Sequence, residues 1–100
     1  MLPIQIDKRK ISDFCRRWHV VEFSLFGSAV REDFKPDSDV DVLVSFEENA
    51  PISLFDMAQM QIELEDLFDR PVDLVEKEGL RNPYRRESIL SSAQVLYVAG

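Results

Sequence analysis

Cysteine and histidine are scarce in this chain, and long apolar runs are missing. Cys15 is the only cysteine and His19 the only histidine in 100 residues, which excludes an intrachain disulfide and a metal centre built from thiolates and imidazoles. No apolar segment approaches the roughly 20 residues of a membrane-spanning helix, and residues 1–5 lack the features of a signal peptide. We therefore expect a cytoplasmic protein that does not bind a membrane.

Basic side chains are outnumbered by acidic ones. The chain has 12 Lys and Arg against 19 Asp and Glu, for a formal net charge of −7. Because proteins that bind nucleic acid cluster Lys and Arg against the phosphates, we expect no direct nucleic-acid binding, and we expect larger partners to be basic. Apolar residues at 45% and charged residues at 31% are typical of a globular protein. At this length we expect residues 1–100 to form a single domain.

Apolar periodicity in the first half of the chain predicts a helix followed by strands. Residues 7–18 carry four apolar side chains at helical spacing, which predicts an amphipathic helix that buries Cys15 as an unreactive thiol. Residues 20–26 and 39–46 alternate as strands do, and His19 before the first strand is expected to be structural. The helical stripe consists of Ile11, Phe14, Cys15 and Trp18.

The second half continues the alternation of helices and strands. Ser53, with Asp56 three residues later, predicts the capped start of a long helix that ends before Pro71. Residues 71–75 predict a third strand, Asn82 and Pro83 the start of another helix, and residues 94–99 a final strand. The expected apolar residues of the two helices are Leu54, Met57, Met60, Ile62, Leu64, Leu67 and Phe68, then Tyr84, Ile89 and Leu90.

This order of elements predicts an α/β (α+β) fold. We expect a mixed sheet of about four strands with helices on one face, which leaves the opposite face of the sheet open. That open face is the one on which the aspartates of the second predicted strand would stand.

Two aspartates lie one residue apart in that strand. Because side chains alternate, Asp39 and Asp41 point to one face while the intervening Val40 points to the other. No basic residue occurs among residues 37–46, and adjacent carboxylates resist joint ionisation unless a cation lies between them. Mg²⁺ is suited to one or two carboxylates completed by water and phosphate. Asp73 would join this predicted metal site if the third strand pairs beside the second.

A Gly-Ser turn lies upstream of the aspartates. Gly27 permits a tight turn and close approach of backbone to a ligand, and Ser28 is a suitable N-cap for a short helix over residues 28–34. Helix starts of this kind bind phosphate through unpaired N–H groups and the helix dipole. Arg31 follows one turn later, where it could reach a phosphate or pair with a neighbouring acid.

The paired aspartates and the Gly-Ser turn each also have an ordinary structural interpretation. An isolated Asp-x-Asp is usually a solvated strand start, and an isolated Gly-Ser is usually only a turn. A calcium loop is a further alternative, because Asp37, Asp39 and Asp41 alternate and Glu48 falls at the twelfth position. It fails because Val42 occupies the sixth position, where such a loop needs glycine. The two halves in this order favour a joint phosphate and metal site.

The motif Gly27-Ser28-x-x-Arg31, followed by Ser38-Asp39-x-Asp41, resembles the signature of the polymerase-β-type nucleotidyltransferase superfamily. Nearly the whole chain resembles the minimal members, the MNT antitoxins encoded beside HEPN ribonuclease toxins. The resemblance implies a polymerase-β-like nucleotidyltransferase palm core without extra domains. Two positions depart from the pattern: Val30 replaces the usual Ala, and Glu32 replaces the Gly that commonly follows the Arg.

The resemblance also implies a mechanism. Asp39 and Asp41 would hold two Mg²⁺ ions, and Asp73 would bind the ion that activates the attacking hydroxyl. The β- and γ-phosphates of ATP would lie against Gly27, Ser28 and Arg31. The acceptor would be a tyrosine hydroxyl of a HEPN toxin, which the chain would silence by AMP transfer.

Two other functions remain open at this point. The chain would be a non-catalytic antitoxin if it neutralised the toxin by binding alone, and it would act on a small molecule if a substrate-binding surface were supplied elsewhere. A basic cluster near the last helix would bind triphosphate or a partner, or would be a solvated helix start. That cluster consists of Arg81, Arg85 and Arg86.

Overall fold

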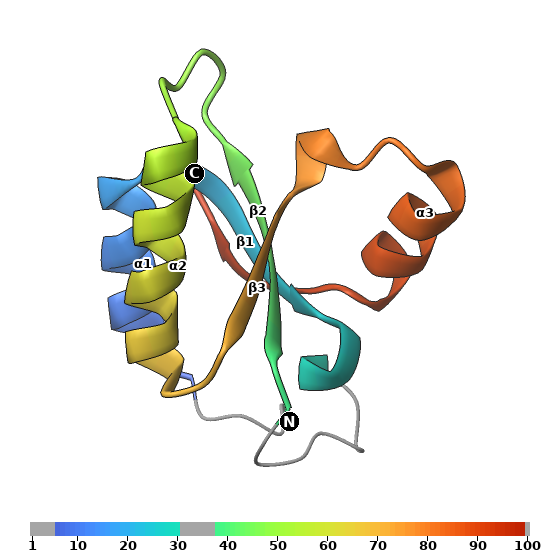
Figure 1. Ribbon diagram of the computed structural model, residues 1–100, viewed down its shortest axis with the longest axis horizontal. Coiled ribbons are helices and arrows are strands. Elements are labelled where there is room, and N and C mark those ends of the chain that lie inside the picture. The colour runs from blue at the N-terminus through green and yellow to red at the C-terminus, as the bar shows by residue number, and fades with distance from the viewer. Residues whose placement is uncertain (1–5, 31–37, 100) are drawn as a thin grey trace.

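A mixed four-stranded sheet organises the protein. The computed structural model describes residues 6–30 and 38–99, and its sheet has the order β3-β2-β1-β4 (Figure 1). β1 is antiparallel to both β2 and β4, whereas β2 and β3 are parallel. The strands are β1 (Val20–Phe26), β2 (Val40–Phe46), β3 (Val72–Glu76) and β4 (Gln94–Val98). The predicted mixed sheet is confirmed, with strand bounds within a residue or two of those expected.

The helices lie on both faces of this sheet. α1 and α2 lie side by side over one face, and α3 lies on the other side (Figure 1). The segments are α1 (Lys8–Arg17), α2 (Leu54–Phe68) and α3 (Pro83–Ser92), with two 3₁₀ turns, η1 (Gly27–Val30) and η2 (Lys77–Gly79). The expectation that all helices share one face is therefore wrong for α3.

Two apolar cores explain this division. The larger core joins α1 and α2 to the sheet, where Phe14 of α1 meets Phe23 of β1 edge to face with ring centroids 6.1 Å apart. The smaller core lies on the opposite face, where Phe26 and Leu43 are buried against Ile89 of α3. Phe26 and Leu43 are apolar side chains on the face expected to be open, so burying them requires a cover on that side.

Side-chain caps define where the helices begin. The Asp7 carboxylate accepts hydrogen bonds from the backbone N–H groups of Arg9 and Lys10. Ser53 and Asp56 form the predicted capping box at the start of α2, and Asn82 caps α3 with Pro83 at its first position. Each cap satisfies N–H groups that would otherwise lack a partner.

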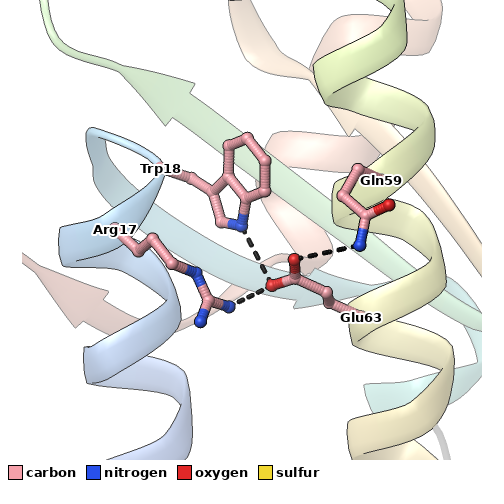
Figure 2. Close-up of polar contacts among 4 residues, drawn as sticks. All are labelled: Arg17, Trp18, Gln59 and Glu63. Atoms are coloured by element: carbon pink, nitrogen blue, oxygen red, sulfur yellow. Dashed lines mark hydrogen bonds and ion pairs between the residues drawn. The ribbon is translucent and has the colours of Figure 1, made fainter.

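A polar contact fixes α1 against α2. The Glu63 carboxylate accepts hydrogen bonds from Trp18 Nε1 at 3.1 Å and Gln59 Nε2 at 3.3 Å, and it pairs with the Arg17 guanidinium (Figure 2). Arg17 and Trp18 lie at the end of α1, whereas Gln59 and Glu63 lie one turn apart on α2. This cluster orders the helix layer on the face away from the aspartates.

Three apolar residues assigned to helix faces are exposed. Leu54 is 88%, Ile62 59% and Tyr84 84% exposed, so these three members of the expected apolar faces are not part of the core. Met60, Leu64 and Phe68 form the buried stripe of α2. Ile62 lies on the side of α2 opposite that stripe, two residues from both Met60 and Leu64. Leu54 and Tyr84 lie in the first turns of their helices.

Cys15 is fully buried, as predicted. Desolvation by burial raises the pKa of its thiol to about 12, so the thiolate needed for reaction is scarce at neutral pH. In the described part of the chain, no helix is both long and apolar enough to cross a bilayer.

Candidate active site

The end of β1 and the starts of β2 and β3 meet at one edge of the sheet. Asp41 is aligned with Phe26 on β1 and with Asp73 on β3. Because β1 runs antiparallel to β2, and β3 parallel to it, the Gly27 turn lies beside the first residues of the two acidic strands. We call the group of Gly27, Asp39, Asp41 and Asp73 the carboxylate edge.

Strand alternation sets the direction of the carboxylates. Val40 and Val42 are fully buried under α1 and α2, so Asp41 points to the opposite face. Asp73 points the same way, since its register partner is Asp41. Leu43, the next residue of β2 on that face, lies under α3. α3 thus covers the middle of this face and leaves the strand starts accessible, with Asp41 half-buried and Asp73 exposed.

Gly27 and Asp41 are in direct contact. Gly27 has a φ of +63°, in the left-handed region, and a Cβ added to it would stand 2.2 Å from Oδ2 of Asp41. A side chain at position 27 would be strained and would also displace the carboxylate. The turn therefore brings backbone against the acid, and the approach of a ligand to this backbone stays a prediction.

Two hydrogen bonds hold the starts of the acidic strands. The backbone N–H of Val40 donates to the carbonyl of Pro71 at 2.9 Å, and the N–H of Val72 donates to Oε2 of Glu65 at 3.0 Å. The first ties β2 to β3 beside Asp39 and Asp41, and the second ties β3 to α2 beside Asp73. Sequence reasoning missed Glu65, because nothing in its helical context marks it as a partner of a strand seven residues later.

The carboxylates fit Mg²⁺ as an open site. Asp41 and Asp73 are in register, and Asp39 immediately precedes β2. Within residues 6–30 and 38–99, no three His, Cys, Asp or Glu side chains are gathered closely enough to hold a metal among themselves. Mg²⁺ characteristically takes one or two carboxylates and completes its shell with water and phosphate. The donor set suits that ion, and the individual metal-binding roles stay predictions.

The rest of the predicted phosphate site is only partly described. The predicted helix begins at Gly27, one residue earlier than expected, and is a 3₁₀ turn as far as Val30. The backbone of Ser28 lies within this turn, and α3, on the same side of the sheet as Asp41, contacts the turn. Arg31 and Glu32 lie outside the described residues.

Arg86, from the basic cluster near α3, has a structural contact. Its Nη1 donates to the carbonyl of Lys77 at 3.1 Å, which ties the start of η2 to the first turn of α3. Arg81 and Arg85 are exposed. A phosphate-binding or partner-binding role for this cluster stays a prediction.

A family model described as the nucleotidyltransferase domain matches residues 8–96, a span that contains every residue of the carboxylate edge. The chain belongs to the nucleotidyltransferase domain family. The resemblance carried by the Gly-Ser turn and the paired aspartates is thereby confirmed. In this nucleotidyltransferase, the matched span runs from the first helix to the last strand.

Relatives of this nucleotidyltransferase occur in archaea. MJ1217 of Methanocaldococcus jannaschii, named provisionally as a protein adenylyltransferase, is 38% identical over 73% of this chain and 72% of its own. The protein adenylyltransferase MntA of Thermococcus cleftensis is 46% identical over 66% of this chain and 65% of its own.

Solved structures share the same fold. A chain described provisionally as a minimal nucleotidyltransferase superposes with a TM-score of 0.71 at 37% identity, covering 87% of this chain and 86% of its own. A chain of a toxin–antitoxin complex with AMP-PNP superposes with a TM-score of 0.76 at 19% identity, covering 94% of this chain and 75% of its own. A chain of the complex of a tri-AMPylated HEPN toxin with an MNT antitoxin, from Shewanella oneidensis, gives a TM-score of 0.65 at 18% identity. It covers 92% of this chain and 70% of its own. At these last two identities the likeness concerns the fold alone.

Proposed function

We propose that this nucleotidyltransferase transfers AMP from ATP to a tyrosine hydroxyl of a HEPN toxin and so acts as its antitoxin. The names of its relatives support protein adenylylation, and the MNT–HEPN complex with the same fold contains an AMPylated toxin. The observation that carries the proposal is the contact of the Asp41 carboxylate with the Gly27 backbone, with Asp73 in register on the next strand.

One set of residues at and beside the carboxylate edge would bind the phosphates, and another would bind the metal. The N–H groups of the turn that begins at Gly27, together with Ser28 and Arg31, would hold the β- and γ-phosphates of ATP. Asp39 and Asp41 would hold both Mg²⁺ ions, and Asp73 would bind the ion nearer the acceptor. Bound Mg²⁺ supplies neutralisation of phosphate charge and a lowered pKa for the acceptor hydroxyl.

The transfer itself requires one bond to form and one to break. The acceptor oxygen bonds to the α-phosphorus of ATP, the bond from that phosphorus to the bridging oxygen breaks, and pyrophosphate leaves. The hydroxyl proton passes to solvent. The chain contributes mainly positioning, because Gly27 and the strand starts hold the carboxylates at fixed places relative to the phosphates.

Intact-mass spectrometry of a co-expressed HEPN toxin tests the proposal. The toxin purified with the wild-type chain is expected to carry one or more AMP groups, and peptide mapping is expected to place them on tyrosine. Toxin purified with Asp39→Asn/Asp41→Asn is expected to be unmodified. Asp66→Asn, which removes an exposed carboxylate from α2, is the matched control and should modify the toxin normally.

Unmodified toxin in every sample would contradict the proposed reaction. If both the wild-type chain and the Asp39→Asn/Asp41→Asn variant then protected cells from the toxin, neutralisation by binding alone would replace it. Modification of the toxin by the double variant would instead show that the assignment of the aspartates is wrong.

A further inference from the structure

Two large apolar side chains stand exposed side by side at the start of α2. Leu54 is 88% and Phe55 89% exposed. They lie beyond the end of β2, whereas the carboxylate edge is at the start of that strand, so the two sites are at opposite ends of the sheet (Figure 1). Adjacent exposed apolar side chains of this size are typical of interaction surfaces.

A hollow opens beside these residues. Its volume is about 390 Å³, and it lies between the end of β2, the start of α2 and the end of β3. Phe46, Leu54 and Met57 contribute apolar surface to it. Four glutamates, Glu47, Glu48, Glu76 and Glu78, also line it, and none of the described residues that line it is basic. We call Leu54, Phe55 and this hollow the α2 surface.

Hydrogen bonds hold parts of the α2 surface in place. Oε2 of Glu78 accepts from the Ser45 hydroxyl at 2.9 Å, and Oε2 of Glu47 lies 3.1 Å from Nδ1 of His19. The capping box of Ser53 fixes the turn that carries Leu54 and Phe55. A surface fixed before binding costs less conformational entropy when a partner docks.

We propose that the α2 surface binds a basic amphipathic helix of a partner protein. One apolar side chain of that helix would fill the hollow and others would cover Leu54 and Phe55, while its Lys and Arg would meet the glutamates. This combination of an apolar face and flanking cations is the chemistry that amphipathic helices offer to grooves. Docking here would leave the carboxylate edge free, so the inference does not depend on the proposed reaction.

The negative charge of the α2 surface favours a basic helix over a membrane, a nucleic acid or a second copy of the chain. An anionic membrane or a nucleic acid would be repelled by four glutamates on a chain of net charge −7. A second copy related by a two-fold axis would place the same glutamates opposite one another, because such an interface uses one patch on both subunits. A basic helix meets both the charge and the apolar surface.

Fluorescence anisotropy with a synthetic peptide tests this proposal. The probe is a labelled helical peptide of leucine and lysine, with leucine at i, i+3, i+4 and i+7, and its control replaces each lysine by glutamate. The wild-type chain is expected to bind the basic peptide and not the acidic one. Phe55→Ser and Glu48→Lys should each weaken binding on the order of tenfold, since both change the centre of the contact.

Matched variants separate specific docking from general attraction. Ile62→Ser removes another exposed apolar residue of α2, and Asp66→Lys makes the same charge change as Glu48→Lys away from the hollow. Both should bind within about twofold of the wild type, as expected for positions outside a contact. Circular dichroism checks that each variant is folded, and Leu54→Ser replaces Phe55→Ser if the latter is not.

Three results would overturn the proposal. The first is no binding of the basic peptide, and the second is an equal loss of binding in the control variants. The third is a wild-type dimer in analytical ultracentrifugation that Phe55→Ser abolishes, because a second copy would then occupy the α2 surface.

Discussion

The carboxylate of Asp41 occupies the space beside Gly27 that a side chain there would need, since a Cβ at position 27 would lie 2.2 Å from Oδ2. Replacing this glycine should therefore damage the site more than the fold. The Asp41 side chain can rotate away from an added methyl group, but its carboxylate then leaves the place where phosphate and metal would meet.

Gly27→Ala is expected to lower AMP transfer about 100-fold, the size of loss that misplacement of about an ångström produces. Its left-handed φ should cost about 1–2 kcal/mol of stability, or roughly 5–15 °C in Tm for a chain of this size. Thermal melting and modification of the HEPN toxin measure the two effects. Gly79→Ala is the matched control, because a Cβ there has nothing within 4 Å. Equal transfer by both variants would contradict the role given to Gly27.

Asp73→Asn should separate catalysis from folding. Asp73 is exposed on β3 and in register with Asp41, so its charge is not needed for packing. We expect transfer to fall about 10²- to 10³-fold, as when one preorganised charged group is lost, and the free energy of unfolding to change by less than about 0.5 kcal/mol. Urea unfolding measures the change in stability, and a transfer assay measures the loss of activity. Full activity in this variant would remove Asp73 from the mechanism.

Glu63→Ala should lower the stability of the fold and leave AMP transfer unchanged, the reverse of Asp73→Asn. The change removes the acceptor of Trp18 Nε1 and the partner of Arg17 on the face away from the carboxylate edge. Leaving a half-buried donor unpaired costs about 1–3 kcal/mol, which urea unfolding should detect. Transfer at a temperature where the variant is folded should match the wild type. A large loss of transfer without a loss of stability would mean that the helix layer takes part in the reaction.

The buried thiol of Cys15 should make the stability of the fold decline at high pH. Burial raises the pKa of its thiol from 9.0 to about 12, so the folded chain keeps the proton at pH values where the unfolded chain loses it. The stability that this thiol contributes is fully present below pH 9 and is lost as pH rises through about 12. Urea unfolding at pH 8 and pH 10 should show a decline that is smaller in Cys15→Ala. An equal decline in both proteins would assign the effect to other groups.

Much of the fold could be predicted because local signals agreed with tertiary contacts. Ser53 with Asp56, Asn82 with Pro83, and the alternation of β2 each specify an element without long-range information. The carboxylate edge was predictable for the same reason, since Asp41 and Asp73 each hold a fixed place in a short strand, and parallel pairing of these strands brought them into register.

The position of α3 was not predictable from its own sequence. Its apolar residues are few, and its placement depends on Phe26 and Leu43, which lie far away in the chain and need a cover on the second face. The α2 surface escaped prediction for a related reason. Helical spacing assigned Leu54 to the apolar face, but Leu54 is exposed and the buried residues of α2 begin only at Met60. The contact of Glu65 with the N–H of Val72 likewise depends on where two elements meet.

Transfer from ATP labelled at either the α- or the γ-phosphate tests the central claim most directly. The wild-type chain, Mg²⁺ and unmodified HEPN toxin are incubated with each label, and Asp41→Asn is run beside them. The account predicts label on the toxin from α-labelled ATP only, no label from γ-labelled ATP, and no label in either case with Asp41→Asn. Label from γ-labelled ATP would indicate phosphoryl transfer. An absence of label with the wild-type chain, or its persistence with Asp41→Asn, would contradict nucleotidyl transfer at the carboxylate edge.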